Sequence, residues 1–315
     1  MLHLGSDVHY WQNGRIGDFI VKSPMVLGHE AAGLVVKVGS ACTRLKPGDR
    51  IAMEPGIPCG NCNCCWGGRY NLCPLVKFAA TPPVHGSLCR LFAHGERWCY
   101  KLADSTTWEE AALLEPLSVG VHAARRGEVK MGDRVFITGA GMIGLVTMMA
   151  CRAAGANWVG ITDINEDRMK KAVELGADEA IPSVGKDPKE VGEKLQCDVC
   201  LECSGAESAT TLCIYAARSG GTVVCIGMGK PEVKIPLIDA LIREVDIKGV
   251  FRYRGAYPIA LDLVESGKVN VKQLVTHRFK LEKALEAFEA ARTMKDNAIK
   301  VVIECTSDDD TPVET

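Results

Sequence analysis

The sequence has almost no net charge and no long hydrophobic run. Its 315 residues carry 37 Lys and Arg against 39 Asp and Glu, a net charge of −2. A nucleic-acid partner or an anionic membrane surface normally requires a basic patch, so this balance argues against both. The apolar stretch Met142–Cys151 ends at Arg152 and is shorter than the roughly 20 residues that span a bilayer. We therefore expect neither nucleic-acid nor membrane partners.

A secretory signal is also lacking. The first residues, MLHLGSDVHYW, have neither a basic n-region nor a hydrophobic h-region. We therefore expect a cytoplasmic protein, whose 15 cysteines are reduced thiols or metal ligands rather than disulfides. The cysteine count is odd, and five cysteines lie within residues 59–73.

The composition changes near residue 116 and divides the chain into two regions. Before it, short β-branched runs such as Ala32–Val38 and Arg50–Met53 lie between turn signals, which predicts a mostly β structure. From 116 to 251, short apolar strands alternate with helical patterns, as in a parallel sheet built from βαβ units. The first strands and helices expected there are Arg134–Thr138, Met142–Ala154, Trp158–Thr162 and Asn165–Leu175.

A glycine-rich motif joins the first strand of this second region to its first helix. Gly139, Gly141 and Gly144 form G-x-G-x-x-G, which indicates dinucleotide binding when it stands between a strand and a helix. The first glycine permits a tight turn, the second lets the backbone approach a pyrophosphate, and the third lets the helix pack on the strand. The helix N-terminus then offers unpaired N–H groups to the phosphates.

Asp163 ends the next strand, about 20 residues after the motif. A carboxylate there accepts hydrogen bonds from the ribose hydroxyls of NAD and repels the 2′-phosphate of NADP, so we expect NAD. Arg168 follows one helical turn later and either lies against the adenosine or is a solvated surface residue. The alternative for the whole motif is a glycine turn followed by a helix-capping Asp.

Four of the five clustered cysteines are spaced as C-x2-C-x2-C-x7-C in a Gly- and Asn-rich loop. Four sulfurs with no open position make a closed, tetrahedral, structural zinc site, which we predict here. Iron–sulfur ligation uses similar spacings, and four neighbouring free thiols are a further alternative. Cys64 falls outside the spacing and is not expected to be a ligand. The expected ligands are Cys59, Cys62, Cys65 and Cys73.

A second set of potential metal ligands contains no sulfur. His29 and Glu30 stand side by side before a β-rich run, and imidazole nitrogen and carboxylate oxygen both suit zinc. Glu115 lies in an apolar stretch, where a buried acid needs a partner that is commonly a cation. A surface His-Glu pair is the alternative. A short polar patch that could relay a proton consists of Ser6, Asp7 and His9.

Together, the G-H-E-x2-G-x5-G run, the cysteine lobe and the nucleotide motif resemble the zinc-containing medium-chain dehydrogenases. Within this family the sequence is similar to the polyol branch, the sorbitol or L-iditol 2-dehydrogenases, over nearly the whole chain. The last two of the matching segments are specific to that branch. The segments are 5–11 (GSDVHYW), 24–30 (PMVLGHE), 68–72 (GRYNL), 115–120 (EPLSVG), 242–253 (IREVDIKGVFRY) and 275–279 (VTHRF).

The resemblance implies an α/β fold with a Rossmann doubly wound parallel sheet and a mostly β, GroES-like catalytic domain. Residues 1–115 and 252–315 would form the catalytic domain, with the zinc lobe at 59–73. Residues 116–251 would form the NAD-binding domain. The implied cofactors are NAD and two zinc ions, one structural and one catalytic.

The resemblance also implies a role for each matching residue. His29 and Glu30 would hold the catalytic zinc, with Glu115 close to the metal or its water. Ser6 and His9 would pass the substrate proton outward. The residues expected at the substrate are Tyr10, Glu115, Arg252 and Tyr253. The residues expected at the cofactor are Gly139, Gly141, Ile143, Gly144, Asp163, Arg168, Ile226, Gly227, Met228, Val250, Phe251 and Arg252.

The implied reaction is the reversible, NAD-dependent oxidation of a polyol such as sorbitol or L-iditol to a ketose such as fructose. Zinc would act as a Lewis acid on the C2 hydroxyl. The implied partners are a small-molecule polyol or ketose and further copies of this chain in a homo-oligomer, for which this branch of the family suggests a tetramer.

Two departures from the family pattern leave alternatives open. The family's first zinc ligand is a Cys where this chain has Leu4, and leucine has no donor atom. His3 is adjacent, but in an extended chain its side chain points to the opposite face. Family members also begin earlier, so we expect an N-terminally incomplete catalytic domain and a weaker catalytic zinc site. The alternatives are a catalytically weak or inactive NAD-binding paralogue or isoform, and another zinc alcohol or threonine dehydrogenase.

Overall fold

The structure, a computed structural model, describes residues 4–306 and, at Leu4, the backbone alone. The chain forms two compact units. Unit 1 consists of Met1–Glu115 and Ala260–Thr315, and unit 2 of Pro116–Ile259. The sequence placed the second boundary at 252, whereas the structure keeps 252–259 in unit 2. No helix of the described range is long and apolar enough to cross a membrane.

Unit 2 is built on one six-stranded parallel sheet with the strand order β10-β9-β8-β11-β12-β13. The first strand, β8, lies inside the sheet, and the chain winds outward from it in both directions. This order confirms the predicted Rossmann doubly wound fold. The strands are β8 (Arg134–Thr138), β9 (Trp158–Thr162), β10 (Glu179–Ala180), β11 (Cys197–Glu202), β12 (Ala217–Cys225) and β13 (Asp246–Gly249).

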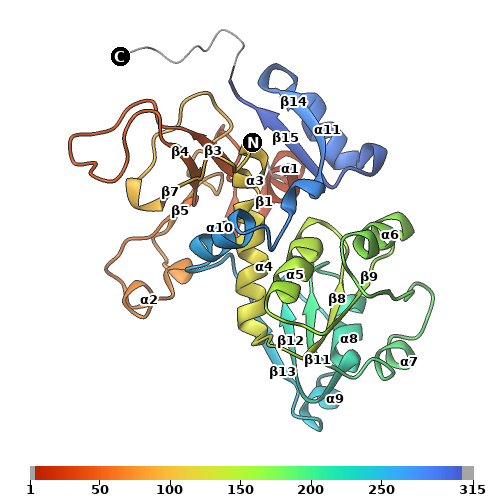
Figure 1. Ribbon diagram of the computed structural model, residues 1–315. Helices are drawn as coiled ribbons and strands as arrows, with labels where there is room; N and C mark the ends of the chain where they lie inside the picture. The colour runs from red at the N-terminus through yellow and green to blue at the C-terminus, as the bar shows by residue number, and fades with distance from the viewer. Residues whose placement is uncertain (1–3, 307–315) are drawn as a thin grey trace. The chain divides into compact units, whose positions relative to one another are not determined.

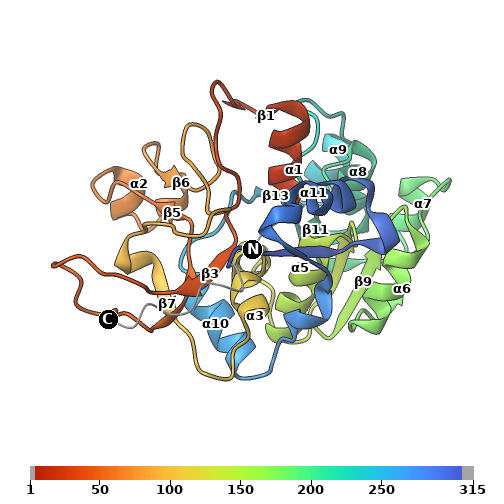
Figure 2. The same cartoon turned by 90° about the horizontal axis from the view of Figure 1, so that it is seen from above.

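Helices cover both faces of this sheet, with α5 and α8 on opposite sides (Figures 1 and 2). The predicted strands Arg134–Thr138 and Trp158–Thr162 are confirmed to the residue. Helix α6 begins after Asn165 because the Asn165 side chain accepts the N–H groups of Asp167 and Arg168. The helices that lie wholly in unit 2 are α5 (Met142–Ala153), α6 (Glu166–Glu174), α7 (Pro188–Gly192), α8 (Glu207–Ala216) and α9 (Leu237–Leu241). Both boundaries between the units fall inside helices, namely α4 (Leu114–Gly127) and α10 (Tyr257–Glu265).

Several cysteines of unit 2 serve as small apolar core residues. Cys197, Cys200 and Cys213 are fully buried and pack with Phe136 and Ile214 in one cluster. Burial raises the pKa of Cys200 and of Cys213 well above that of an ordinary thiol, so both stay neutral. All 15 cysteines of the chain lie outside disulfides, where the sequence predicted reduced thiols or metal ligands.

Unit 1 contains several small sheets rather than one large one. A three-stranded antiparallel sheet has the order β3-β4-β7, and the other strands form pairs. The strands are β1 (Arg15–Ile16), β2 (Phe19–Ile20), β3 (Ala31–Leu34), β4 (Arg50–Met53), β5 (Gly56–Ile57), β6 (Lys77–Phe78), β7 (Cys99–Lys101), β14 (Val275–Lys280) and β15 (Lys300–Glu304). The helices are α1 (Leu4–Asn13), α2 (Asn63–Trp66), α3 (Trp108–Ala112) and α11 (Ala284–Thr293).

The N-terminal segment is helical rather than extended from Leu4 onward, so the expectation of an extended chain there was wrong; His3 lies outside the described residues. Helix α1 packs on α11, and Val8 is buried in a cluster with Phe288. The Trp11 ring meets the Phe288 ring edge-on, with centroids 5.5 Å apart. This packing stabilises a short helix that propensity alone would not support.

The backbone is closely packed at the turn between β8 and α5, and a substitution there tests this packing. A Cβ at Gly144 would lie 1.8 Å from the carbonyl oxygen of Gly139. Because the contact is with backbone, we expect Gly144→Ala to lower the free energy of unfolding by about 3 kcal/mol. Gly33→Ala in β3 is the control, since a Cβ there has no neighbour within 4 Å. Urea unfolding measures both, and equal losses in the two variants would contradict this packing.

Candidate active site

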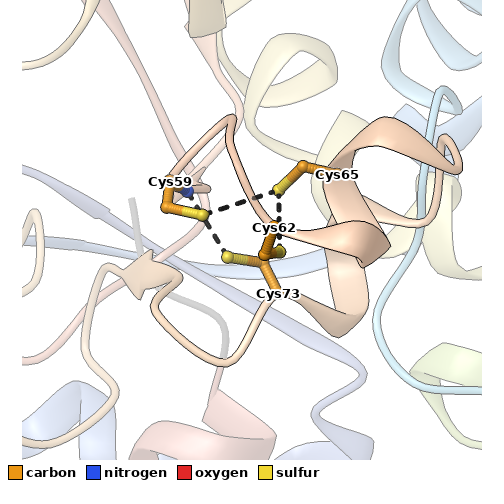
Figure 3. Close-up of side chains that lie close together, drawn as sticks. All are labelled: Cys59, Cys62, Cys65 and Cys73. Atoms are coloured by element: carbon orange, nitrogen blue, oxygen red, sulfur yellow. Dashed lines mark hydrogen bonds between the residues drawn. The ribbon is translucent and has the colours of Figure 1, made fainter.

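Four thiols of the cysteine-rich loop converge on one point (Figure 3). The sulfur atoms of Cys59 and Cys65 lie 4.0 Å apart, and those of Cys62 and Cys65 lie 3.5 Å apart. With the Cys73 sulfur, all four lie within 4.8 Å of one another, and Cys64 is not part of the group. A tetrahedral zinc ion with bonds of about 2.3 Å holds its sulfurs roughly 3.8 Å apart. The four thiols therefore fit zinc.

Backbone N–H groups point at these sulfurs. The N–H of Asn61 donates to the Cys59 sulfur at 3.5 Å, and the N–H of Cys59 donates to the Cys73 sulfur at 3.4 Å. The Asn61 N–H and the Cys73 thiol lower the pKa of Cys59 to about 6. Burial and the Cys62 thiol raise the pKa of Cys65 to about 12. A divalent cation in the centre would displace the remaining protons, because thiolates are the metal-binding form.

A buried carboxyl group ties this loop to the β3-β4-β7 sheet. Glu54 directly follows β4 and is 1% exposed. It accepts the Tyr70 hydroxyl, which belongs to the loop, and the Tyr100 hydroxyl of β7, both at 2.7 Å. Burial raises the pKa of Glu54, and the two hydroxyl groups oppose that change. These hydrogen bonds, which involve no metal, attach the loop to the sheet.

A second cluster of ligand atoms lies in the interior of unit 1. His29, Glu30 and Glu115 place one ligand atom each within 4.8 Å of the others, and all three residues are buried. His29 and Glu30 directly precede β3, and Glu115 lies in the first turn of α4. The structure thus brings together residues that lie far apart in the sequence and were predicted to bind one ion.

Asp7 on α1 fixes the imidazole of this cluster. Its carboxylate is fully buried, accepts the N–H of Gly28 at 2.9 Å and lies 3.3 Å from Nδ1 of His29. A carboxylate that holds one ring nitrogen in this way is typical of metal-ligating histidines. Burial lowers the pKa of His29, but the carboxylates of Asp7, Glu115 and Glu30 outweigh burial and raise that pKa to about 9. The carboxylates that hold a proton on His29 would also stabilise a divalent ion bound beside it.

Glu30 has an ion-pair partner that the sequence analysis did not identify. Lys300, the first residue of β15, reaches the Glu30 carboxylate with Nζ, and both side chains are almost completely buried. The carboxyl groups of Glu30 and Glu115 are buried beside the His29 imidazole, with a ligand atom of each within 4.8 Å of the others. Buried groups of this kind fit a divalent cation. The sequence offered one signal, a lysine at the start of an otherwise apolar strand.

The residues expected to relay a proton lie on α1. Ser6 is half-buried, Tyr10 is buried, and His9 is exposed, with its Nδ1 3.1 Å from the Asn13 side-chain nitrogen. Residues three apart share one face of a helix, so Ser6 and His9 lie on the same face of α1. The side chain of Leu4, where the family has its cysteine ligand, lies outside the described part of the structure.

In unit 2 the glycine motif forms a turn between β8 and α5. Gly139 adopts φ +93°, a conformation that favours glycine, and Gly141 precedes the first turn of α5. The Asp163 carboxylate at the end of β9 accepts the N–H of Ala140 at 2.7 Å, which connects the two strand ends. Nη1 of Arg168 lies 4.0 Å from that carboxylate, so Arg168 lies beside the motif rather than out in solvent. The half-buried motif residue on α5 is Ile143.

The other residues expected at the cofactor follow β12 and β13, whose carboxyl ends lie at the same sheet edge as the glycine turn. The guanidinium of Arg252 lies 4.7 Å from the ring centroid of Phe251. Tyr253 is 2% exposed and its ring lies 5.6 Å from that of Tyr257. The half-buried residues of these two segments are Ile226, Gly227, Val250, Phe251 and Arg252, and the exposed one is Met228.

Two family models match the chain. Residues 3–104 match the alcohol dehydrogenase GroES-like domain, and residues 143–266 match the zinc-binding dehydrogenase domain. Sorbitol dehydrogenase of Mus musculus is 54% identical over 315 residues, which cover 98% of this chain and 87% of the mouse protein. Sorbitol dehydrogenase of Gallus gallus is 50% identical over 314 residues, which cover 98% of this chain and 88% of the chicken protein.

Solved structures agree with these matches. An Escherichia coli oxidoreductase of unknown specificity has a TM-score of 0.90 at 38% identity, over 96% of this chain and 89% of that chain. L-idonate 5-dehydrogenase of Escherichia coli has a TM-score of 0.87 at 31% identity, over 95% and 88%. Because the family models match well over half of the chain and the relatives almost all of it, the chain belongs to the zinc-containing medium-chain dehydrogenase family.

Proposed function

We propose that this chain is an NAD-dependent polyol dehydrogenase that converts a polyol such as sorbitol or L-iditol to the ketose, and the ketose back to the polyol. One observation carries the proposal. A buried His29, Glu30 and Glu115 cluster with metal-ligand geometry occurs in a chain about half identical to sorbitol dehydrogenases along nearly its whole length. Fifteen free cysteines favour a reducing compartment such as the cytoplasm.

Unit 1 is the catalytic domain in this proposal, and unit 2 binds the dinucleotide. When bound, zinc supplies a Lewis acid for the substrate hydroxyl and NAD supplies the two-electron acceptor. His29 and Glu30 hold the ion, Glu115 lies close to it or to its water, and Asp7 orients His29. Ser6 and His9 carry the hydroxyl proton toward solvent. The polyol hydroxyls are contacted by Tyr10, Arg252 and Tyr253.

The cofactor residues divide by the part of NAD that they contact. Gly139, Gly141 and Gly144 receive the pyrophosphate, and the Asp163 carboxylate accepts ribose hydroxyls of the adenosine, which selects NAD over NADP. Arg168 lies beside the adenosine. Around the nicotinamide we place the segments after β12 and β13, namely Ile226, Gly227, Met228, Val250, Phe251 and Arg252.

A second candidate function is NAD binding with weak or no catalysis. Leu4 favours it, because the position of a thiolate ligand then holds a side chain with no donor atom. A third is oxidation of simple alcohols or threonine by the same chemistry. Polar residues at the substrate, such as Arg252 and Tyr10, argue against an aliphatic alcohol, which would favour an apolar cleft.

A substrate panel combined with metal analysis tests the proposed function. We expect NADH formation from sorbitol or L-iditol with NAD, little activity with NADP, and zinc in both clusters, more tightly held by the four cysteines. Strong ethanol turnover without polyol turnover would support the third candidate. Normal NADH binding with one zinc per chain and no turnover would support the second.

The contact between Asp7 and His29 gives a specific prediction for the catalytic cluster. Asp7→Asn removes the charge that orients and polarises the imidazole, so we expect zinc affinity at this cluster or kcat/KM to fall by about 10- to 100-fold. Asp49→Asn is a matched control, because Asp49 pairs with Lys101 at 2.8 Å in the same unit without contact to the cluster. Unchanged zinc affinity and kcat/KM in Asp7→Asn would show that this carboxylate does not support the metal.

We also propose that two copies of the chain pair along β13, within an oligomer that this branch of the family suggests is a tetramer. Strand β13 is an edge of the parallel sheet, and an edge strand offers unpaired N–H and C=O groups to a second copy. Apolar side chains that are normally covered lie exposed beside it. They are Leu237, Ile238, Leu241 and Ile242 on or next to α9, and Ile247 on β13.

The apolar side chains around α9 predict how to disrupt this pairing. The double variant Ile238→Glu, Ile242→Glu introduces charges into the proposed contact, so we expect light scattering to report a smaller oligomer. Val184→Glu is the control, because Val184 is 65% exposed and follows β10, the strand at the other edge of the sheet. A double variant with the same mass as wild type would place the contact elsewhere.

A further inference from the structure

Glu202 is a buried acid that neither the sequence analysis nor the family resemblance identified. It is the last residue of β11 and is 1% exposed. Its position is at the carboxyl edge of the sheet, where ligands of doubly wound folds bind. A buried carboxylate in that place requires an explanation, because burial without hydrogen-bond partners is costly.

The side chain of Glu202 organises the loop that follows its own strand. Oε1 accepts the N–H of Ser204 at 2.7 Å, the N–H of Gly205 at 2.8 Å and the hydroxyl of Ser204 at 2.6 Å. The Ser204 hydroxyl oxygen in turn accepts the N–H of Ala206 at 3.1 Å. Three hydrogen bonds to one buried oxygen thus hold loop 203–206 in a fixed shape.

Glu202 also contacts the loop that follows the neighbouring strand β12. Here the main-chain carbonyl oxygen of Glu202 accepts the N–H groups of Ile226 at 2.8 Å and Gly227 at 2.9 Å. A Cβ at Gly227 would lie 2.7 Å from Oε2 of Glu202 and 2.1 Å from the nitrogen of Gly205. The carboxylate therefore lies between the two loops.

The two loops touch each other through backbone alone. A Cβ at Gly229 would lie 1.7 Å from the carbonyl oxygen of Gly205, and a Cβ at Gly205 would lie 2.7 Å from the nitrogen of Gly229. Loop 203–206 also meets the nucleotide motif, since a Cβ at Gly139 would lie 3.1 Å from the nitrogen of Ser204. Three turns at the ends of β8, β11 and β12 thus form one continuous surface around Glu202.

The strand order indicates which half of the dinucleotide this surface faces. A doubly wound sheet binds one nucleotide on each side of the point where the strand order reverses, here between β8 and β11. Asp163 lies on the β9 side and takes the adenosine half. We propose that Glu202 is a positioning residue whose side chain fixes loop 203–206 and, through the backbone contact of that loop with 226–229, shapes both loops for the nicotinamide half of NAD. This inference rests on the proposed dinucleotide site.

The test compares two probes that share the adenosine half. Without the carboxylate the loops must be ordered when the ligand binds, so we expect Glu202→Ala to weaken NADH by about tenfold and ADP-ribose by less than about twofold. NADH fluorescence and calorimetry measure the two affinities. Glu207→Ala is the matched control, because the Glu207 carboxylate accepts a backbone N–H, that of Lys234 at 2.9 Å, yet is exposed at the start of α8.

Two conservative variants separate positioning from general destabilisation. Glu202→Gln keeps an acceptor oxygen and is expected to restore most of the NADH affinity. Ser204→Ala removes one hydroxyl of an exposed residue, which donates to Glu202 and accepts from Ala206. It remains informative if Glu202→Ala fails to fold, and we expect it to weaken NADH about two- to threefold and leave ADP-ribose unchanged.

Three results would overturn the inference. The first is equal weakening of NADH and ADP-ribose in the folded variants, and the second is no effect on NADH. The third is a wild-type chain that binds neither probe, which would remove the proposed dinucleotide site itself; the first two leave that site intact.

Discussion

Three carboxylates, those of Asp7, Glu30 and Glu115, are buried close together in unit 1, and their charge is the constraint on which the active site depends. Lys300 and the raised pKa of His29 offset part of this charge. Removing one partner of a buried ion pair typically costs about 3–5 kcal/mol, because the other charge stays behind. These buried groups therefore depend on one another, and a divalent cation held by His29, Glu30 and Glu115 would fit among them.

The two groups of potential metal ligands in unit 1 differ in their donor atoms, as expected for a structural and a catalytic zinc site. Cys59, Cys62, Cys65 and Cys73 supply four sulfurs from one loop, which closes the coordination sphere and suits an ion that shapes the loop. The loop is also held by Glu54, which accepts hydrogen bonds from the hydroxyl groups of Tyr70 and Tyr100. The His29, Glu30 and Glu115 cluster supplies one nitrogen and two oxygens from two segments, the residues before β3 and the first turn of α4. Three protein ligands are the usual number in catalytic zinc sites. In unit 2, a single buried residue, Glu202, likewise contacts two loops.

Features that depend on local spacing were predictable from the sequence. The glycine motif, the cysteine spacing and the strands Arg134–Thr138 and Trp158–Thr162 are set by residues near one another in the chain. The Lys300 partner of Glu30 is 270 residues away, and no spacing rule could have found it. Helix α1 was expected to be extended because its stability comes from packing on α11. The role of Glu202 depends on backbone contacts between loops that only the folded chain brings together.

The central claim is that unit 1 binds zinc in two chemically different donor sets. X-ray absorption at the zinc edge of the zinc-saturated protein tests it most directly. The account predicts sulfur neighbours at about 2.3 Å and nitrogen or oxygen neighbours at about 2.0–2.1 Å, with about two sulfurs per zinc on average. Sulfur neighbours alone, at about four per zinc, would contradict it, because the His29, Glu30 and Glu115 cluster would then hold no ion.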